Sequence, residues 1–104
     1  MESSELDKWT NEVILQLIPE SGSDINNDET FDEDGLDADS LAIVEIMYSV
    51  TDKFGIEIAD ENIEEIRTVG DLKLYIITHS DKFDATDAEK LDLDKSRFKE
   101  IAQL

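Results

Sequence analysis

Cysteine is absent from this chain of 104 residues, and histidine, proline and tryptophan each occur once. Without cysteine, the chain can form neither a disulfide framework nor a cysteine-ligated metal site. The single histidine, His79, has no second histidine or cysteine to join it as a ligand, so we expect no metal site. We interpret His79 as a residue near the C-terminal end of a helix, where a partial positive charge is favourable.

Basic residues are also few. Nine lysines and arginines stand against 28 aspartates and glutamates, which gives a formal net charge of −19. Such a charge repels nucleic acids and anionic membrane surfaces, and it favours partners that present lysine and arginine. No apolar run is long enough to span a bilayer, and the acidic first residues lack the apolar core of a secretion signal. We therefore expect a cytoplasmic monomer that inserts into no membrane and binds no nucleic acid.

Residue sets typical of enzymes are missing as well. The sequence has no serine–histidine–aspartate set, no metal-ligand cluster and no glycine-rich phosphate loop, so we expect no catalytic residue. The hydrophobic fraction of 39% is sufficient for one modest core in a chain of this length. These absences make an enzyme the least favoured class of function.

Apolar residues recur at the spacing of an α-helix, which predicts an all-α fold. The first helix is expected from Ser4 to Ile18, ending before Pro19. Its apolar stripe comprises Leu6, Trp9, Val13, Ile14, Leu17 and Ile18. Trp9 fits this stripe as a core residue better than as a ligand contact. Residues 20–34 are rich in polar turn formers and predict a long loop, which Ile25 and Phe31 fasten to the core.

An acidic cluster in this loop raises the question of a calcium site. Asp24, Asn26 and Asp28 alternate like the first ligands of an EF-hand loop. However, Glu29 stands where that loop needs glycine, and Gly35 where it needs a bidentate glutamate. We therefore reject an EF-hand and leave weak divalent-ion binding open beside the interpretation as a solvated loop.

The second helix is predicted to run from Ser40 to Lys53. Asp39 and Ser40 are both good N-cap residues, and apolar residues follow at helical spacing. The residues expected to face inward are Leu41, Val44, Ile46, Val50 and Phe54. Taken locally, Ser40 could serve only to satisfy a free backbone N–H at this helix start.

Two further helices are expected before residue 80. Gly55 ends the second helix, and a short acidic helix capped by Asp60 runs to about Ile66. Thr68 and Asp71 resemble a capping box for a last helix that reaches about residue 78. The side chains expected to face the core are Ile63, Ile66, Leu72, Tyr75 and Ile76.

Residues 81–104 are interpreted as an extension of a bundle formed by residues 1–80. The residues from Thr86 to Glu89 read as another capping box, and an amphipathic stretch begins near Asp94. The apolar residues of this stretch are Leu93, Phe98, Ile101 and Leu104, and its basic neighbours are Lys82, Lys90, Lys95, Arg97 and Lys99. We expect the extension to fold back on the acidic bundle as a helix. Binding to a partner or to a second copy is the alternative.

Five short motifs follow one another between Phe31 and about Ile77. They are Asp39-Ser40-Leu41, Val44-Glu45, Phe54-Gly55-Ile56-Glu57-Ile58, the acidic segment Asp60–Ile66 and Thr68-Val69-Gly70-Asp71-Leu72. In this order and spacing they resemble the acyl carrier proteins. The resemblance covers roughly the middle half of the chain closely, and residues 6–17 more loosely.

This resemblance implies a four-helix bundle of three longer helices and one short third helix, with a long first loop. Here a C-terminal helical segment is added. It also implies that Ser40, between Asp39 and Leu41, carries 4′-phosphopantetheine, which a phosphopantetheinyl transferase attaches from coenzyme A. Free backbone N–H groups and the dipole at a helix start suit a phosphate. Because no base is near Ser40 in the sequence, this serine is expected to be the substrate of another enzyme.

The resemblance further implies that the protein delivers an acyl or aminoacyl thioester to enzymes of fatty-acid, polyketide or other specialised biosynthesis. Loading and processing enzymes with basic patches would dock on the second helix. The expected docking residues are Asp39, Ile43, Glu45, Met47, Tyr48 and Asp52. Ala42, Ile43 and Lys53 replace acidic or small polar residues of the family, which favours dedicated partners.

An attached acyl chain would lie between the helices, in a space lined by Ile46, Val50, Ile66 and Leu72. The same residues would form an ordinary core in a protein without cargo. Asp37 replaces a glycine of the family, and aspartate tolerates left-handed backbone better than most residues. The alternative function is an acidic helical interaction module, or a degenerate carrier without a prosthetic group.

Overall fold

Six α-helices and one 3₁₀ turn make up the regular structure of residues 1–22 and 25–104, which the computed structural model describes. They are α1 (Ser3–Leu17), η1 (Pro19–Ser21), α2 (Ser40–Phe54), α3 (Asp60–Ile63), α4 (Val69–His79), α5 (Ala85–Lys90) and α6 (Lys95–Ala102). The only β-type pairing in these ranges is an isolated bridge between Thr30 and Thr68. Within these ranges, no helix combines the length and the apolar composition that a transmembrane segment needs. The predicted all-α fold is confirmed.

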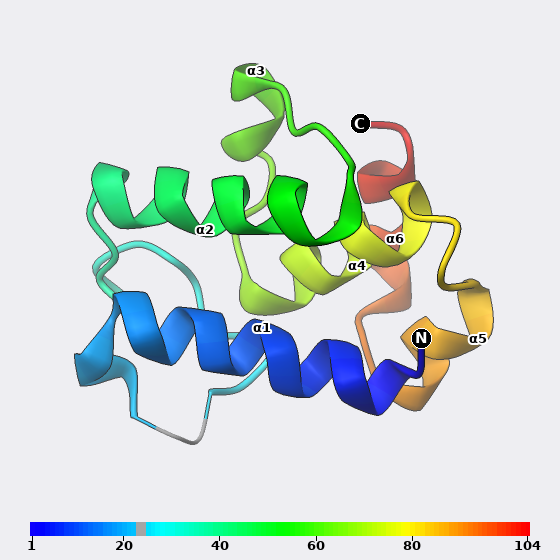
Figure 1. The fold of residues 1–104 in the computed structure, drawn as a ribbon, viewed down its shortest axis with the longest axis horizontal. Coiled ribbons are helices and arrows are strands. Elements are labelled where there is room, and N and C mark those ends of the chain that lie inside the picture. Colours follow the sequence, from blue (N-terminus) through cyan, green and yellow to red (C-terminus); the bar gives the residue numbers. More distant parts are fainter. Residues whose placement is uncertain (23–24) are drawn as a thin grey trace.

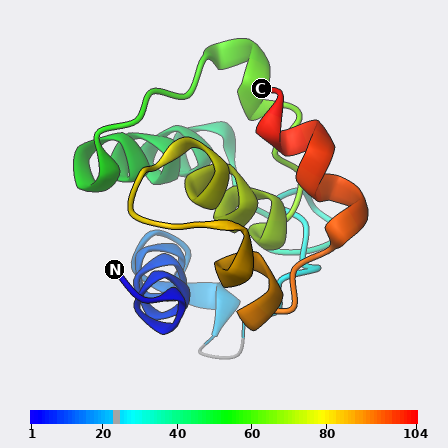
Figure 2. The ribbon, with the colours of Figure 1, turned by 90° about the vertical axis from the view of Figure 1, so that its right-hand side faces the viewer.

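Helix α4 lies in the middle of the molecule, with α1 and α2 on one side of it and α6 on the other (Figures 1 and 2). All nine residues from 69 to 77 are buried. The sequence predicted one buried face for this helix, containing Leu72, Tyr75 and Ile76. The burial is wider because α6, which lies far along the chain, covers the face that the preceding helices leave open.

The long first loop is fastened to the core as predicted, since Ile25 and Phe31 are both buried. Trp9 also behaves as a core residue, because its ring packs edge-on against Phe54 with ring centroids 5.0 Å apart. Asp24 lies outside the described residues, so the alternation of possible calcium ligands from Asp24 onward is not tested. No group of three or more acidic, histidine or cysteine side chains suited to a metal ion occurs in residues 1–22 and 25–104.

Two of the helix boundaries confirm the sequence prediction and one corrects it. Gly55 ends α2 with the left-handed φ of 70°. Thr68 and Asp71 form the predicted capping box at the start of α4. Helix α3 is only four residues long, shorter than predicted, and Ala59 rather than Asp60 occupies its N-cap position. No side chain caps α3, and a single unsupported turn has little stability of its own.

The extension contains a second capping box, but not the predicted one. Its two residues are Asp84 and Asp87, two positions before the expected pair, and they start α5. The buried Phe83 directly precedes this cap and belongs to the same core as Ala88, an arrangement typical of a hydrophobic staple. The burial of Phe83 therefore places the helix start earlier than the side-chain pattern alone suggested. Asp94 caps α6, close to its predicted beginning.

Lys73 of α4 is completely buried, which the sequence did not indicate. Its Nζ atom lies 2.5 Å from Asp7 Oδ1 of α1 and 2.7 Å from Asn27 Oδ1 of the first loop. A buried ammonium group is tolerated when its hydrogen bonds are satisfied. Lys73 thus joins three segments that are distant in sequence.

The Lys73–Asp7 pair is expected to respond unequally to the loss of either partner. The Asp7 side chain is 42% exposed, so in Lys73→Met water can solvate its carboxylate, and we expect a loss of about 1–2 kcal/mol. Asp7→Ala leaves the ammonium group buried with one neutral partner, and we expect a loss of about 2–4 kcal/mol. Urea unfolding of both variants measures the difference. A larger loss in Lys73→Met would contradict this account.

Candidate functional site

Helix α2 is capped by Asp39 and begins with Ser40 as its first residue. Asp39 has an extended backbone, and its Oδ1 atom accepts a hydrogen bond of 2.8 Å from the backbone N–H of Ala42. Asp39 therefore satisfies the free N–H that Ser40 could have satisfied. Ser40 is exposed, and no hydrogen bond to its hydroxyl occurs among the described residues. The structure thus presents a serine hydroxyl that the helix start does not use.

The loop before Ser40 is held in place from both sides. Phe31 and Leu36 are buried, and the backbone N–H of Phe31 donates to the carbonyl of Arg67 at 3.0 Å. The N–H of Ala38 donates back to the Phe31 carbonyl at 2.8 Å. Asp37 takes a φ of 53°, so the predicted left-handed conformation is confirmed. These contacts connect the position of Ser40 to the segment that leads into α4.

Gly35 is required by a close backbone approach in this loop. A Cβ atom at this position would lie 2.2 Å from the carbonyl oxygen of Thr30 and 2.7 Å from its Oγ1 atom. Thr30 Oγ1 and the N–H of Asp34 also donate to Asp32 Oδ1, at 2.6 and 3.0 Å. These two hydrogen bonds hold the pKa of the Asp32 carboxyl below its ordinary value, and the bond from Thr30 has the larger effect.

An open cavity of about 500 Å³ lies between the end of α1 and the start of α2, lined by both chain neighbours of Ser40, Asp39 and Leu41, but not by Ser40 itself. Its lining residues include Ile18, Pro19, Leu36, Asp39 and Glu45. The first turn of a helix of this length also offers free backbone N–H groups and a partial positive charge. Because Ser40 is exposed, its surroundings have room and suitable polarity for a phosphate ester on its hydroxyl.

The structure corrects the predicted orientation of α2. Leu41 and Val44 were expected to face inward, but they are 66% and 54% exposed. Met47 was expected on the surface, but it is buried, while Tyr48 is exposed as predicted. The buried side of α2 is formed by Ile46, Met47, Val50 and Phe54. Because α2 carries apolar residues on most of its circumference, the pattern alone could not show which side meets α1.

As a result, exposed apolar side chains follow Ser40 along one side of α2. Leu41, Val44 and Tyr48 are spaced by three and four residues, which places them on one face of the helix. The sequence predicts Tyr48 on this exposed face, but it wrongly places Leu41 and Val44 in the core. Three acidic residues on the same helix or at its cap are exposed as expected: Asp39, Glu45 and Asp52. Ile43, another predicted surface residue, is half-buried.

The four residues predicted to surround a cargo chain are all in the core. Ile46, Val50, Ile66 and Leu72 are between 0 and 3% exposed and belong to one cluster. The structure thus brings together residues from α2, from α4 and from the segment between α3 and α4. They are packed side chains, as expected for a core that would have to loosen before it held a ligand.

His79 lies far from Ser40. Its ring stacks on Tyr75 with centroids 4.0 Å apart, and it lines a cavity together with Thr51 near the end of α2. Ser40 and Thr51 are eleven positions apart, which corresponds to about 16 Å along a helix. His79 therefore cannot act as a base for Ser40, and a serine without an adjacent base is a poor nucleophile.

Comparisons with known proteins agree with this arrangement. Residues 10–76 match the family described as "Phosphopantetheine attachment site". The chain is 38% identical over 66 residues to the acyl carrier protein of Chlamydia caviae, which covers 64% of this chain and 84% of that protein. It is 41% identical over 68 residues to the acyl carrier protein of Wolinella succinogenes, covering 65% of this chain and 88% of the relative.

A third relative is longer than the others. The meromycolate extension acyl carrier protein of Mycobacterium leprae is 42% identical over 65 residues, which cover 62% of this chain and 56% of the relative. Proteins of this family are carriers rather than enzymes, and their attachment domain holds 4′-phosphopantetheine covalently. The matching residues include α2, most of α4 and the loop that presents Ser40. The chain therefore belongs to the acyl carrier protein family, whose members contain a phosphopantetheine attachment domain.

Proposed function

We propose that Ser40 is the attachment site of 4′-phosphopantetheine and that the protein carries an acyl or aminoacyl group as a thioester on it. The observation that carries this proposal is the exposed Ser40 hydroxyl, which Asp39 leaves free by capping α2. The prosthetic group would supply the thiol, since the chain contains no cysteine. The protein then acts by holding its cargo at high effective concentration near each enzyme that docks.

The modifying enzyme in this proposal is a phosphopantetheinyl transferase. A bond forms between Ser40 Oγ and the phosphorus next to the pantetheine of coenzyme A, and the pyrophosphate bond breaks. The adenosine bisphosphate leaves, and the serine proton passes to a base of the transferase. Residues 1–80 form the carrier unit in this proposal and residues 81–104 an extension to it, in keeping with a family match that ends at residue 76.

The experiment is an intact-mass measurement after incubation with a broad-specificity transferase, coenzyme A and Mg²⁺. We expect the mass of one phosphopantetheine to be added and peptide mapping to locate it on Ser40. If folded protein stays unmodified with several transferases, the alternative of an acidic interaction module without a prosthetic group replaces this proposal.

The exposed face of α2 is the proposed docking surface for partner enzymes. Leu41, Val44 and Tyr48 form an apolar strip beside Ser40, and the strip is bordered by the acidic residues Asp39, Glu45 and Asp52. A complementary partner would present an apolar patch surrounded by lysine and arginine. The departure of the strip from a wholly acidic surface favours enzymes of a dedicated pathway.

Replacing Tyr48 by alanine is expected to weaken docking without preventing modification. Tyr48 is 74% exposed, so its loss should leave stability almost unchanged. Aromatic residues at the centre of interfaces contribute about 1–2 kcal/mol or more. We therefore expect the KM of the transferase for this protein to rise about tenfold. Leu15→Ala on the exposed side of α1 is the matched control, and equal rates for both variants would exclude α2 as the docking face.

A further inference from the structure

The C-terminal part of the chain, with helix α6, contacts the short helix α3 and the residues that follow α3 in the sequence. α6 lies against α4 on the side opposite α1 and α2 (Figure 2). Ile101 of α6 is fully buried, and Leu93, which lies just before the start of α6, is 5% exposed. Two apolar anchors thus fix α6 on the body of the protein, and from there its polar residues reach the α3 region.

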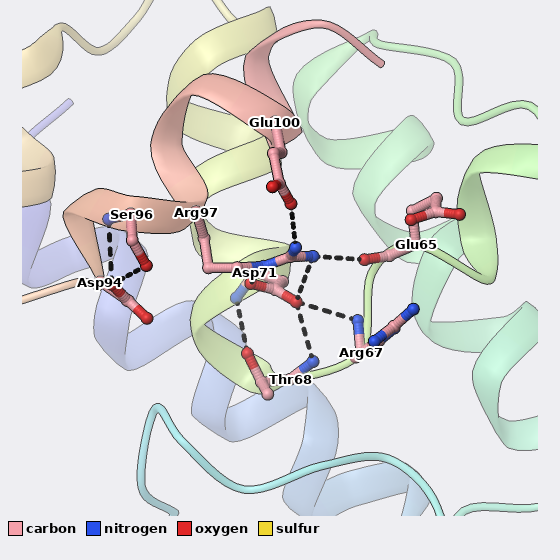
Figure 3. A network of polar contacts seen from close by, with 8 residues as sticks. All are labelled: Glu65, Arg67, Thr68, Asp71, Asp94, Ser96, Arg97 and Glu100. Atoms are coloured by element: carbon pink, nitrogen blue, oxygen red, sulfur yellow. Dashed lines mark hydrogen bonds and ion pairs between the residues drawn. The ribbon is translucent and has the colours of Figure 1, made fainter.

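Arg97 of α6 makes the main polar contact. Its Nε and Nη2 atoms lie 3.2 Å from the two carboxylate oxygens of Asp71, in the first turn of α4. Its Nη2 atom also donates to the carbonyl of Glu65 at 3.0 Å, two residues after the end of α3 (Figure 3). Glu100 of α6 accepts a further hydrogen bond from Nη1. One guanidinium group thereby joins α6, α4 and the segment after α3.

Asp71 is an anchor that cannot easily move. Its side chain is 5% exposed, and its Oδ2 atom also accepts from the backbone N–H groups of Arg67 and Thr68, at 3.1 and 3.4 Å. Charge-assisted, multidentate pairs of this kind hold both geometry and position. Arg97 therefore connects the carbonyl of Glu65 to the fixed N-terminal end of α4.

A second contact joins the end of α6 to α3 itself. Asn62 of α3 donates from Nδ2 to the backbone carbonyl of Leu104 at 3.1 Å. Helix α3 has a single turn, no side-chain cap and no completely buried residue, so such outside contacts decide whether it stays in place. The buried Ile66, one of the proposed cargo-lining residues, directly follows Glu65.

We infer that α6 is a clasp that keeps α3 and Ile66 closed over the core, and that Arg97 is the positioning residue that limits how readily a long acyl chain enters the bundle. The inference rests on the proposed attachment of cargo at Ser40. A packed core admits a chain only if some element moves, and α3 is the weakest one beside the four lining residues. Contacts that exist only while the core is closed must be broken before an acyl chain can enter. Their free energy therefore opposes entry of the chain.

The first experiment needs no cargo. Hydrogen exchange is measured in the unmodified protein at the amides of Glu65 and Ile66, which donate to Asn62 and Ile63 at 3.0 and 3.2 Å. In Arg97→Gln we expect exchange about tenfold faster at these two amides, because a charge-assisted hydrogen-bond network has been lost. The amide of Ile18 in the α1 region serves as the reference for global opening. Equal acceleration at Ile18, or no acceleration at Glu65 and Ile66, would overturn the inference that Arg97 holds the segment after α3 in place.

The second experiment tests the effect on cargo. A broad-specificity phosphopantetheinyl transferase transfers acyl-phosphopantetheine from acyl-coenzyme A to Ser40, with acyl groups of four, eight or twelve carbons, and adenosine bisphosphate leaves. Cleavage of the thioester by hydroxylamine is then timed. In Arg97→Gln we expect about threefold to tenfold slower cleavage than in the unsubstituted protein for the two longer chains, and no change for the shortest. A merely structural role for Arg97 would not produce this dependence on chain length.

Two variants complete the design. Lys99→Gln removes the same charge from an exposed position of α6 and should behave like the unsubstituted protein in both experiments. Asn62→Ala removes the contact to Leu104 without touching Arg97, and it should shift both readouts in the same direction as Arg97→Gln. If loading of Ser40 fails, the proposed function is wrong, and so is the proposed role of Arg97 in limiting the entry of long acyl chains. If loading succeeds but Arg97→Gln changes the cleavage rate equally for all three chain lengths, or not at all, only the inference about α6 is wrong.

Discussion

Replacing Ser40 by alanine is expected to abolish addition of phosphopantetheine completely while leaving the fold intact. The hydroxyl is the only group of Ser40 that could form the phosphodiester, so no partial activity should remain. Because Asp39 supplies the cap of α2 and Ser40 is exposed, stability should change by about 0.5 kcal/mol or less. Intact-mass spectrometry measures the modification, and urea unfolding measures the stability.

The matched control is Ser49→Ala on the same helix. Ser49 Oγ donates to the carbonyl of Glu45 at 2.9 Å, a contact within α2 that does not involve the start of the helix. This variant should accept phosphopantetheine at the normal rate. Modification of Ser40→Ala to any extent would show that another residue is the acceptor.

Replacing Gly35 by alanine should produce the largest loss of stability among single substitutions in the first loop. The added Cβ would meet the Thr30 carbonyl oxygen at 2.2 Å and the Thr30 nitrogen at 2.7 Å, and backbone atoms cannot rotate away as a side chain can. We expect a loss of about 2–4 kcal/mol in urea unfolding. Because this loop leads to Ser40, the rate of modification should fall as well.

Gly55→Ala is the informative comparison, since it separates steric from conformational effects. Gly55 has a φ of 70° and no atom within 4 Å of an added Cβ. Alanine at this position suffers only from the left-handed backbone, and we expect a loss of about 1 kcal/mol. A loss in Gly55→Ala equal to or larger than that in Gly35→Ala would contradict the steric explanation.

Much of the candidate site was predictable from local patterns. The helix start at Ser40, the glycine that ends α2 and the capping box of Thr68 and Asp71 all depend on residues within four positions of one another. Caps and turns have such short-range chemistry, so a single sequence reveals them. The resemblance to the acyl carrier proteins rested on the same local motifs, and the family comparison agrees with it.

The orientation of α2 and the full burial of α4 were not predictable in this way. An apolar residue indicates that a helix has a buried side, but α2 carries apolar residues on more than one side, so Met47 was placed outside and Leu41 and Val44 inside. The choice depends on how α2 meets α1 across the long first loop.

The sequence alone thus determined where α2 begins and ends and that a phosphate could be held at its first turn. The structure decided that Asp39 rather than Ser40 caps α2, and it showed the close backbone approach that requires Gly35. Which apolar face of α2 stays exposed depends on the assembled helices, and so do the contacts by which Lys73 and Arg97 join distant segments. The reason is physical. Caps and turns are formed between neighbours in the chain, whereas burial and ion pairing depend on contacts between residues such as Arg97 and Asp71, which only folding brings together.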